Sequence, residues 1–253
     1  MASDDVNRGL PSGVDPARVA ARARAVARKQ AEAPSRVAAG QGAPTASRLP
    51  PGQTAVRKWP RLDLGVLPEV DLAGHAVRID GLCRRPLQFD LAAIAALPQH
   101  ASLQDFHCVT GWSRLDLQFS GVRVRDVLQL AGAADDARFL LVRGADGYSA
   151  NLPREQVERD DVLLVTHWDG APLPIDHGGP IRMVTPQLWA WKGVKWVSRI
   201  ELRRTDRRGF WERRGYSNTA DPFRDDRFDG GVAPATYAVE VPDDAEPYQP
   251  EET

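Results

Sequence analysis

Apolar residues in the middle of the chain fall into short runs that polar or glycine-containing stretches separate. Short runs rich in Val, Ile, Leu and aromatic residues, bounded by turn signals, are typical of β-strands. Asp146-Gly147 and Asp169-Gly170 are two such turn signals. The runs predict strands at residues 77–81, 103–107, 139–143, 148–152, 162–167, 181–185 and 194–202. A shorter run at residues 119–122 predicts a strand end or a turn.

Short helices are predicted between these strands. Asp90 is a suitable N-cap for a helix that Pro98 ends, and residues 123–130 carry one apolar face and stop at Gly132. Residues 153–158 predict a helical turn. Because strands and helices do not alternate regularly, the pattern predicts an α+β fold of mixed sheets with short helices rather than a doubly wound sheet.

Composition divides the chain into three parts: residues 1–47, 48–228 and 229–253. The first part has seven Lys/Arg against four Asp/Glu and almost no large apolar residues, so it predicts a mobile basic arm. Asp15 and Pro16 favour a weak helix that runs to about Gln30, but its apolar positions are mostly alanine and would bury little. A solvated arm is favoured over a nucleic-acid or partner contact. The last part has seven acidic residues and no basic ones, which predicts a disordered acidic tail.

Overall composition is that of a soluble globular protein, with 253 residues, 42% hydrophobic and 26% charged, and a formal net charge of −1. This charge gives no reason to expect nucleic acid or an anionic membrane as a partner. Two cysteines make no disulfide framework, and without a C-x-x-C pair a zinc site is poorly supported. The sequence has no targeting segment and no apolar run long enough to span a bilayer, so we expect a cytoplasmic location.

Cys108 lies in a mid-chain stretch, residues 105–117, that fits neither a regular strand nor a helix interior. It follows a predicted strand and precedes Thr110-Gly111, so the strand is expected to deliver this cysteine into a tight loop. A thiolate is a soft ligand that suits a redox-active metal. Taken alone, the stretch favours the plainer interpretation that Cys108 is a small buried hydrophobe.

A second stretch, residues 176–199, contains an arginine in an apolar strand. Arg182 stands between Ile181 and Met183, so its guanidinium leaves an apolar run, and such an arginine usually meets an anion such as phosphate. Gly178-Gly179, just upstream, allow the backbone to come close to a ligand. The stretch therefore predicts an anion site.

Two lysines further along this stretch extend the predicted anion site. Lys192 and Lys195 flank the backbone N–H groups of Gly193 and Val194, and together these groups would complete an anion cradle. The alternative is a surface strand with solvated charges. That alternative is acceptable for Lys192 alone but not for the group as a whole.

The two stretches together strongly resemble the sulfite oxidase family, in its molybdopterin-binding oxidoreductase domain. The motifs that carry the resemblance are "FHCVTGW" and "HGGPIRMVTPQLWAWKGVKWV", supported by "RIDGLCRRPL", "DGYSANLP" and "GFWERRGYSNTADPFRDDRF". The likeness runs from about residue 49 to residue 228. It is greatest to small bacterial sulfite-oxidase-like oxidoreductases, and the methionine sulfoxide reductase catalytic subunit is a more distant relative. The resemblance implies a sulfite-oxidase-type molybdopterin-binding domain.

The resemblance also implies site residues. Cys108 matches the cysteine that ligates molybdenum, beside the two sulfurs of the pterin dithiolene and oxo or hydroxo groups. Other positions match those that hold the pterin and its phosphate: His177, Arg182, Gly193, Val194 and Lys195. Ser149 is a weaker match to a pterin contact, and His107, next to the metal ligand, is a further candidate to touch the cofactor. The implied cofactor is Mo-molybdopterin.

The implied reaction is two-electron oxo transfer between Mo(VI) and Mo(IV), with a separate electron-transfer protein as partner. Sulfite, a sulfoxide or an N-oxide is the implied kind of substrate. Small relatives often carry arginine at the position of Gly111, and Arg114 is the catalytic candidate that would replace it. The alternative is a family member that binds the cofactor without turnover, as a carrier or structural protein, and Gly111 is the only feature that favours this.

Remaining candidates are aromatic or isolated. Trp112, Trp189 and Trp191 would wall a substrate pocket or simply pack in the core, and the sequence does not separate the two. Cys83 receives no role, and a disulfide between Cys83 and Cys108 is expected to be absent because it would occupy the metal ligand.

Overall fold

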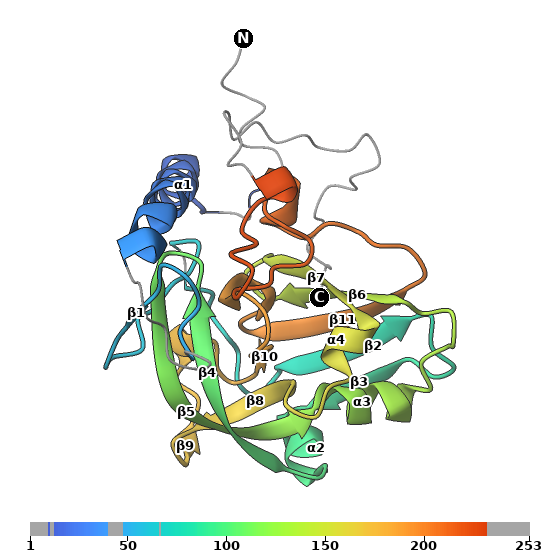
Figure 1. Ribbon diagram of the computed structural model, residues 1–253. Helices are drawn as coiled ribbons and strands as arrows, with labels where there is room; N and C mark the ends of the chain where they lie inside the picture. The colour runs from blue at the N-terminus through green and yellow to red at the C-terminus, as the bar shows by residue number, and fades with distance from the viewer. Residues whose placement is uncertain (1–9, 11–12, 40–47, 66, 232–253) are drawn as a thin grey trace.

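The computed structural model describes residues 10, 13–39, 48–65 and 67–231, with the side chains of residues 29–39 left out. Its strands form two mixed sheets (Figure 1). In the first sheet the order is β1 (Thr54–Ala55), β5 (Trp112–Arg123), β8 (Leu163–Trp168) and β10 (Arg182–Val184), while β4 (His100–Cys108) pairs with β5 and β9 (Ala171–Pro172) with β8. In the second sheet the order is β3 (Leu87–Asp90), β2 (Ala76–Gly81), β11 (Val197–Arg203), β6 (Phe139–Gly144) and β7 (Ser149–Pro153).

The α-helices among the described residues are α1 (Pro16–Ala39), α2 (Leu91–Ala96), α3 (Val124–Ala131) and α4 (Arg154–Val157). Mixed sheets with mainly short helices confirm the predicted α+β class. The remaining short helical turns are η2 (Ile175–His177), η3 (Ala190–Lys192), η4 (Glu212–Arg214) and η5 (Asp229–Gly231).

Local sequence signals explain the two helices that were predicted in the middle of the chain. The carboxylate of Asp90 accepts a hydrogen bond from Ala93 N (2.7 Å) and caps α2. Helix α3 buries Val124, Val127, Leu128 and Ala131, and Gly132 ends it in the left-handed conformation, with φ of 66°. Caps and apolar periodicity thus determine both elements locally.

Strand β5 is much longer than the sequence predicted, because only a strand end or turn was expected at residues 119–122. Its polar positions do not alternate cleanly with apolar ones, and Asp116 has a positive φ of 58°. Pairing with β4 and β8 over most of its length holds the strand together despite this irregularity. Strand β11 instead begins at Val197, later than predicted, because Trp196 also has a positive φ of 49° and interrupts an extended run.

An aromatic cluster underlies the first sheet. The ring of Trp59 makes edge contacts with Phe106 and Phe119 at 5.3 Å and with Trp168 at 5.0 Å between ring centroids. These buried rings pack with aliphatic residues of β8 and β10. The cluster fixes the face of β4 from which Phe106 and Cys108 project.

Helix α1 is the largest departure from the expected mobile arm. Val19, Ala23 and Val26 are buried and belong to the main core cluster. Their spacing of three and four residues places them on one helical face, so even small side chains dock the helix (Figure 1, upper left). The expectation that this part of the arm is solvated is therefore wrong for the described turns of α1. The three-part division of the chain stays a prediction.

The other end of the folded region packs back onto the core. Phe210, Trp211, Tyr216 and Phe228 are buried, whereas Phe223 is exposed. The expected disordered acidic tail lies, beyond residue 231, outside the described residues.

Candidate functional site

A cavity that is partly open to solvent lies between the end of β4, helix α1 and the segment that joins β10 to β11, with about 810 Å³ of empty space when the adjoining open solvent is included. Aromatic residues form most of its walls: Trp59, Phe106, Trp112, Tyr148, Trp191, Trp196, Trp211 and Tyr216. Its charged or reactive lining comprises Arg22, Asp63, Cys108, Asp146, His177, Arg182 and Lys195. Such an aromatic cavity with a few converging polar groups is the usual form of a cofactor or substrate site.

Cys108 is the last residue of β4 and lies in this cavity. Its sulfur is 3.1 Å from Thr110 Oγ1 in the turn that connects β4 to β5. Burial raises the pKa of the Cys108 thiol, and the hydrogen bond with Thr110 opposes this only in part. A strand that ends in a tight turn thus delivers the cysteine as predicted. Cys83 and Cys108 are both free, so no disulfide occupies the sulfur.

The turn after Cys108 accounts for the glycine within it. Gly111 has φ of 98°, which L side chains rarely adopt, and its N–H donates to the carbonyl of Cys108 (3.0 Å). The backbone conformation of this turn therefore suits a glycine at this position.

Arg182 is the buried cation of the site. Its Nη1 donates to the carbonyl of His177 (2.8 Å), and its guanidinium carbon lies 5.1 Å from the ring centroids of both Trp59 and Phe106. Its buried Nε has no hydrogen-bond partner. Burial lowers the pKa of Arg182 to about 10, so the group stays protonated at neutral pH. A charged buried donor without a partner is the feature expected of an anion-binding arginine.

Lys195 adds a second cation. Its Nζ donates to the carbonyl of Asp176 (2.8 Å), and burial, with repulsion from Arg182, lowers the pKa of Lys195 to about 7. Gly178 lies against the Lys195 side chain at φ of 105°, and a Cβ there would come within 2.8 Å of Lys195 Cγ. Burial also raises the pKa of Asp146 to about 6.

His177 lines the same cavity from η2. Its ring stacks on Trp59 with 4.4 Å between ring centroids. Burial lowers the pKa of His177, which keeps the ring neutral at pH 7 and available as a hydrogen-bonding group.

The structure therefore brings together most of the residues predicted for the site: Cys108, His177, Arg182, Gly193 and Lys195. Val194 lies between Gly193 and Lys195 in the chain but does not itself line the cavity. Its carbonyl accepts a hydrogen bond from Met183 N (2.8 Å). The N–H of Gly193 donates to the carbonyl of Ala190 (3.1 Å). The side-chain part of the predicted cradle thus faces the cavity, while the N–H of Gly193 is already engaged.

Three predicted site residues lie elsewhere. His107 points to the opposite face of β4, where Nδ1 is 2.8 Å from Ser113 Oγ, because successive strand residues alternate between faces. Ser149 is buried in β7, outside the cavity lining, and its carbonyl accepts from Phe210 N (2.8 Å). Arg114 bonds to the carbonyl of Leu115 on its own strand and does not line the cavity.

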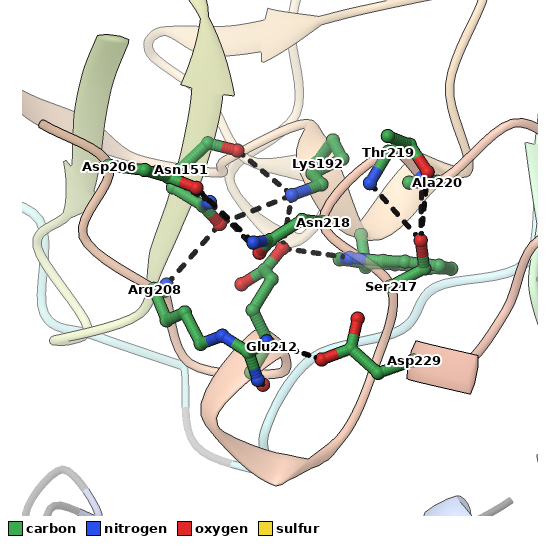
Figure 2. Close-up of polar contacts among 12 residues, drawn as sticks. Asn151, Lys192, Asp206, Arg208, Glu212, Ser217, Asn218, Thr219, Ala220 and Asp229 are labelled. Carbon is green, nitrogen blue, oxygen red and sulfur yellow. Dashed lines mark hydrogen bonds and ion pairs between the residues drawn. The ribbon is translucent and has the colours of Figure 1, made fainter. Parts of the chain in front are cut away.

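Lys192, which was a weaker candidate for the cradle, has a structural role. Its Nζ lies 2.7 Å from Glu212 Oε1 and donates to Asn151 O (2.9 Å) and Asn151 Oδ1 (3.2 Å) (Figure 2). Glu212 Oε1 also accepts from Trp191 Nε1 (3.0 Å). This buried network ties the cavity wall at Trp191 to the C-terminal segment. Of the three candidate wall tryptophans, Trp112 and Trp191 line the cavity and Trp189 is core.

Sequence reasoning missed several cavity residues. Trp59 follows a Pro- and Gly-containing stretch without periodic neighbours, and Arg22 lies on a helix that was expected to be solvated. Tyr148 and Asp146 flank a turn, and only their position beside a predicted strand could have signalled them. Tyr148 is anchored by its hydroxyl, which donates to the carbonyl of Trp191 (2.5 Å).

Within the described ranges, His, Cys, Asp and Glu side chains form no cluster of three or more with metal-site geometry. None of the described helices is both long and apolar enough to cross a bilayer.

Comparisons with known proteins agree on one family. A family model described as "Oxidoreductase molybdopterin binding domain" matches residues 64–211. The "Uncharacterized oxidoreductase YuiH" of Bacillus subtilis is 36% identical over 182 residues, which cover 72% of this chain and 92% of YuiH. The "Putative protein-methionine-sulfoxide reductase subunit YedZ1" of Azospira oryzae is 29% identical over 149 residues, 59% of this chain and 56% of that protein.

Two further matches cover a smaller share of the protein that is compared. Mitochondrial sulfite oxidase of Rattus norvegicus is 30% identical over 134 residues, 49% of this chain and 24% of the oxidase. The crystal structure of the sulfane dehydrogenase SoxCD from Paracoccus pantotrophus matches with a TM-score of 0.52 and 24% identity, over 55% of this chain and 41% of that chain. The last match is a likeness of fold.

Proposed function

Since the chain belongs to the molybdopterin-binding oxidoreductase family, with sulfite oxidase among its relatives, we propose that it performs two-electron oxo transfer at a molybdenum ligated by Cys108. The observation that carries this proposal is the convergence of the Cys108 thiol, Arg182 and Lys195 on one cavity. A soft sulfur ligand and two cations are the groups that a metal–pterin cofactor with a phosphate requires.

The residues present fit this cofactor. A buried Arg182 Nε without a partner suits a phosphate oxygen, and Lys195 supplies a second charge to the same cavity. Aromatic walls suit a flat heterocycle. The Mo-molybdopterin cofactor would supply the two-electron oxo-transfer chemistry when bound.

The chain's own residues would position this chemistry and screen it from water. Cys108 would hold the metal as a thiolate, so metal binding would be coupled to release of its proton. The rings of Trp59 and Phe106 pack against the guanidinium of Arg182 and restrict its movement. Around them, the aromatic walls lower the local dielectric, which strengthens each charge interaction in the cavity. Electrons would pass to or from a separate electron-transfer protein.

A matched pair of cysteine variants tests the proposal. C108S is expected to lose both molybdenum and turnover of sulfite, sulfoxides and N-oxides, whereas C83S, at a thiol outside the cavity, is expected to keep both. Molybdenum is measured by elemental analysis, and pterin by the fluorescence of its oxidised form. Full molybdenum and turnover in C108S would refute Cys108 ligation.

The alternative function is that of a cofactor carrier without turnover. It predicts a wild-type protein with stoichiometric molybdenum and pterin that acts on none of these acceptors. Gly111, the feature that favoured this alternative, has a positive φ of 98° that suits a glycine, so its presence alone does not indicate lost turnover.

A further inference from the structure

Helix α1 forms one side of the cavity although it lies outside the region that the family model matches, residues 64–211. Both Arg22 and Val26 line the cavity. Val19, Ala23 and Val26 are buried against the core, so the helix is docked and its cavity-facing side is fixed. This chain thus adds a wall to the site from its own N-terminal segment.

Arg22 carries a positive charge into that wall. Its Nη1 donates to the carbonyl of Asp63, and among the neighbouring charges the carboxylate of Asp63 stabilises the charged guanidinium most. The carboxylate of Asp63 is itself engaged, since it accepts from Gly65 N (2.8 Å) and lies 3.4 Å from Arg61 Nε. Arg22 is half-buried, and burial lowers the pKa of its guanidinium despite the opposing charge of Asp63. A half-buried arginine with a shifted pKa in such a cavity is a candidate to bind an anion.

Arg22 and Cys108 line the same cavity. Asp63 and Cys108 are among the groups whose charges act on Arg22. Asp63 also acts on Lys195, and Cys108 also acts on Arg182. Arg182 and Lys195 enter the cavity from β10 and the segment between β10 and β11, and Arg22 enters it from α1. Arg114, the sequence candidate for a substrate-binding arginine, does not line the cavity.

We propose that Arg22 binds the anionic oxygens of a small oxyanion substrate in the cavity that also holds Cys108, which makes α1 part of the substrate site and Arg22 a specificity-determining residue. This inference rests on the proposed function. A guanidinium offers a planar fork of N–H donors that matches two oxygens of an oxyanion, and it keeps its charge at any physiological pH. The same chemistry would bind the phosphate of the cofactor, so the experiment must separate the two anions.

Binding of inorganic sulfate to the loaded wild-type protein provides the test, because sulfate resembles an oxyanion substrate but is not turned over. Titration calorimetry with sulfate reports binding without any turnover. The variants are R22Q, which removes the charge, and R22K, which keeps it. R24Q is the matched control, since Arg24 lies on the same helix but is exposed. Molybdenum, pterin and thermal stability are measured for each protein.

R22Q is expected to weaken sulfate binding at least about tenfold, as loss of a charge-assisted hydrogen bond does, and to raise the KM for sulfite in the same direction. R22K should recover part of the affinity, and R24Q should match the wild type, with molybdenum and pterin unchanged throughout. If R22Q binds sulfate with wild-type affinity and holds its full molybdenum, the inference about Arg22 is overturned, while the proposed function still stands. Parallel loss of sulfate binding and of cofactor from R22Q would assign the arginine to the cofactor phosphate and overturn it as well.

Failure of the proposed function has a different signature. A wild-type protein that carries neither molybdenum nor pterin, from a host that makes the cofactor, refutes the proposed function and with it the substrate assignment. In that case R22Q and R24Q would not differ in cofactor content, because neither protein would hold any.

Discussion

Removal of the Lys192 ammonium should destabilise the fold more than any substitution of a surface charge. Both Lys192 and Glu212 are fully buried, and the ion pair joins Nζ to Oε1 at 2.7 Å. K192M keeps most of the side-chain volume but leaves a carboxylate in the core without its cation. Breaking one partner of a buried pair costs about 3–5 kcal/mol, and the two acceptors on Asn151 also lose their donor.

That loss corresponds to a fall in Tm of roughly 10 °C for a domain of this size. Urea unfolding, followed by tryptophan fluorescence, measures it directly. The double variant K192M/E212L replaces the pair with apolar groups and should recover part of the stability, although Trp191 Nε1 then lacks its acceptor. R204M is the control, because Arg204 pairs with Asp136 at the surface, with 70% and 49% of their side chains exposed, and should cost less than about 1 kcal/mol.

The reasoning would be refuted by a K192M protein that unfolds within about 1 kcal/mol of the wild type. It would also fail if the double variant were no more stable than K192M, because the penalty would then not come from an uncompensated charge.

Three further outcomes follow from the site. Lys195 has a pKa of about 7 in the folded protein and 10.5 in an unfolded chain, so the unfolded state binds more protons between these two pH values. The stability of the cofactor-free protein should therefore rise with pH across this window, by up to about 1.4 kcal/mol per pH unit. Urea unfolding from pH 7 to 9 measures this rise, and K195M should flatten it. W59A should lower the free energy of unfolding by about 3–5 kcal/mol and reduce bound molybdenum, since Trp59 supports Phe106 and Arg182; normal molybdenum in a folded W59A would count against that support. G111A should cost about 1–2 kcal/mol because of the positive φ of Gly111, and a neutral effect in thermal melts would show that the turn tolerates a side chain.

Local signals in the sequence were enough for elements whose pattern is self-contained. The cap at Asp90, the αL glycine after α3 and the burial of Val127 and Leu128 all follow from spacing of a few residues. The two stretches that hold Cys108 and Arg182 could likewise be recognised from their residues, and the cavity brings them together. It was harder to predict which side chains face the cavity, because His107, one position before Cys108 on β4, lies on the other face of the strand.

Features that depend on distant parts of the chain were not predictable in this way. The packing of α1 depends on a groove that other segments build, and its alanine-rich face gives only a weak signal by itself. Irregular strands such as β5 are stabilised by their partners rather than by their own pattern. Lys192 and Lys195 are three residues apart, yet only the fold turns one into a core ion pair and the other toward the cavity.

The central claim is that Cys108 ligates molybdenum in this cavity. X-ray absorption at the molybdenum edge tests it most directly, on wild-type protein and on C108S and C83S variants that are supplied with the cofactor. The account predicts one more sulfur neighbour at the metal in the wild type and in C83S than in C108S, or no metal at all in C108S. The same number of sulfur neighbours in all three proteins would contradict it.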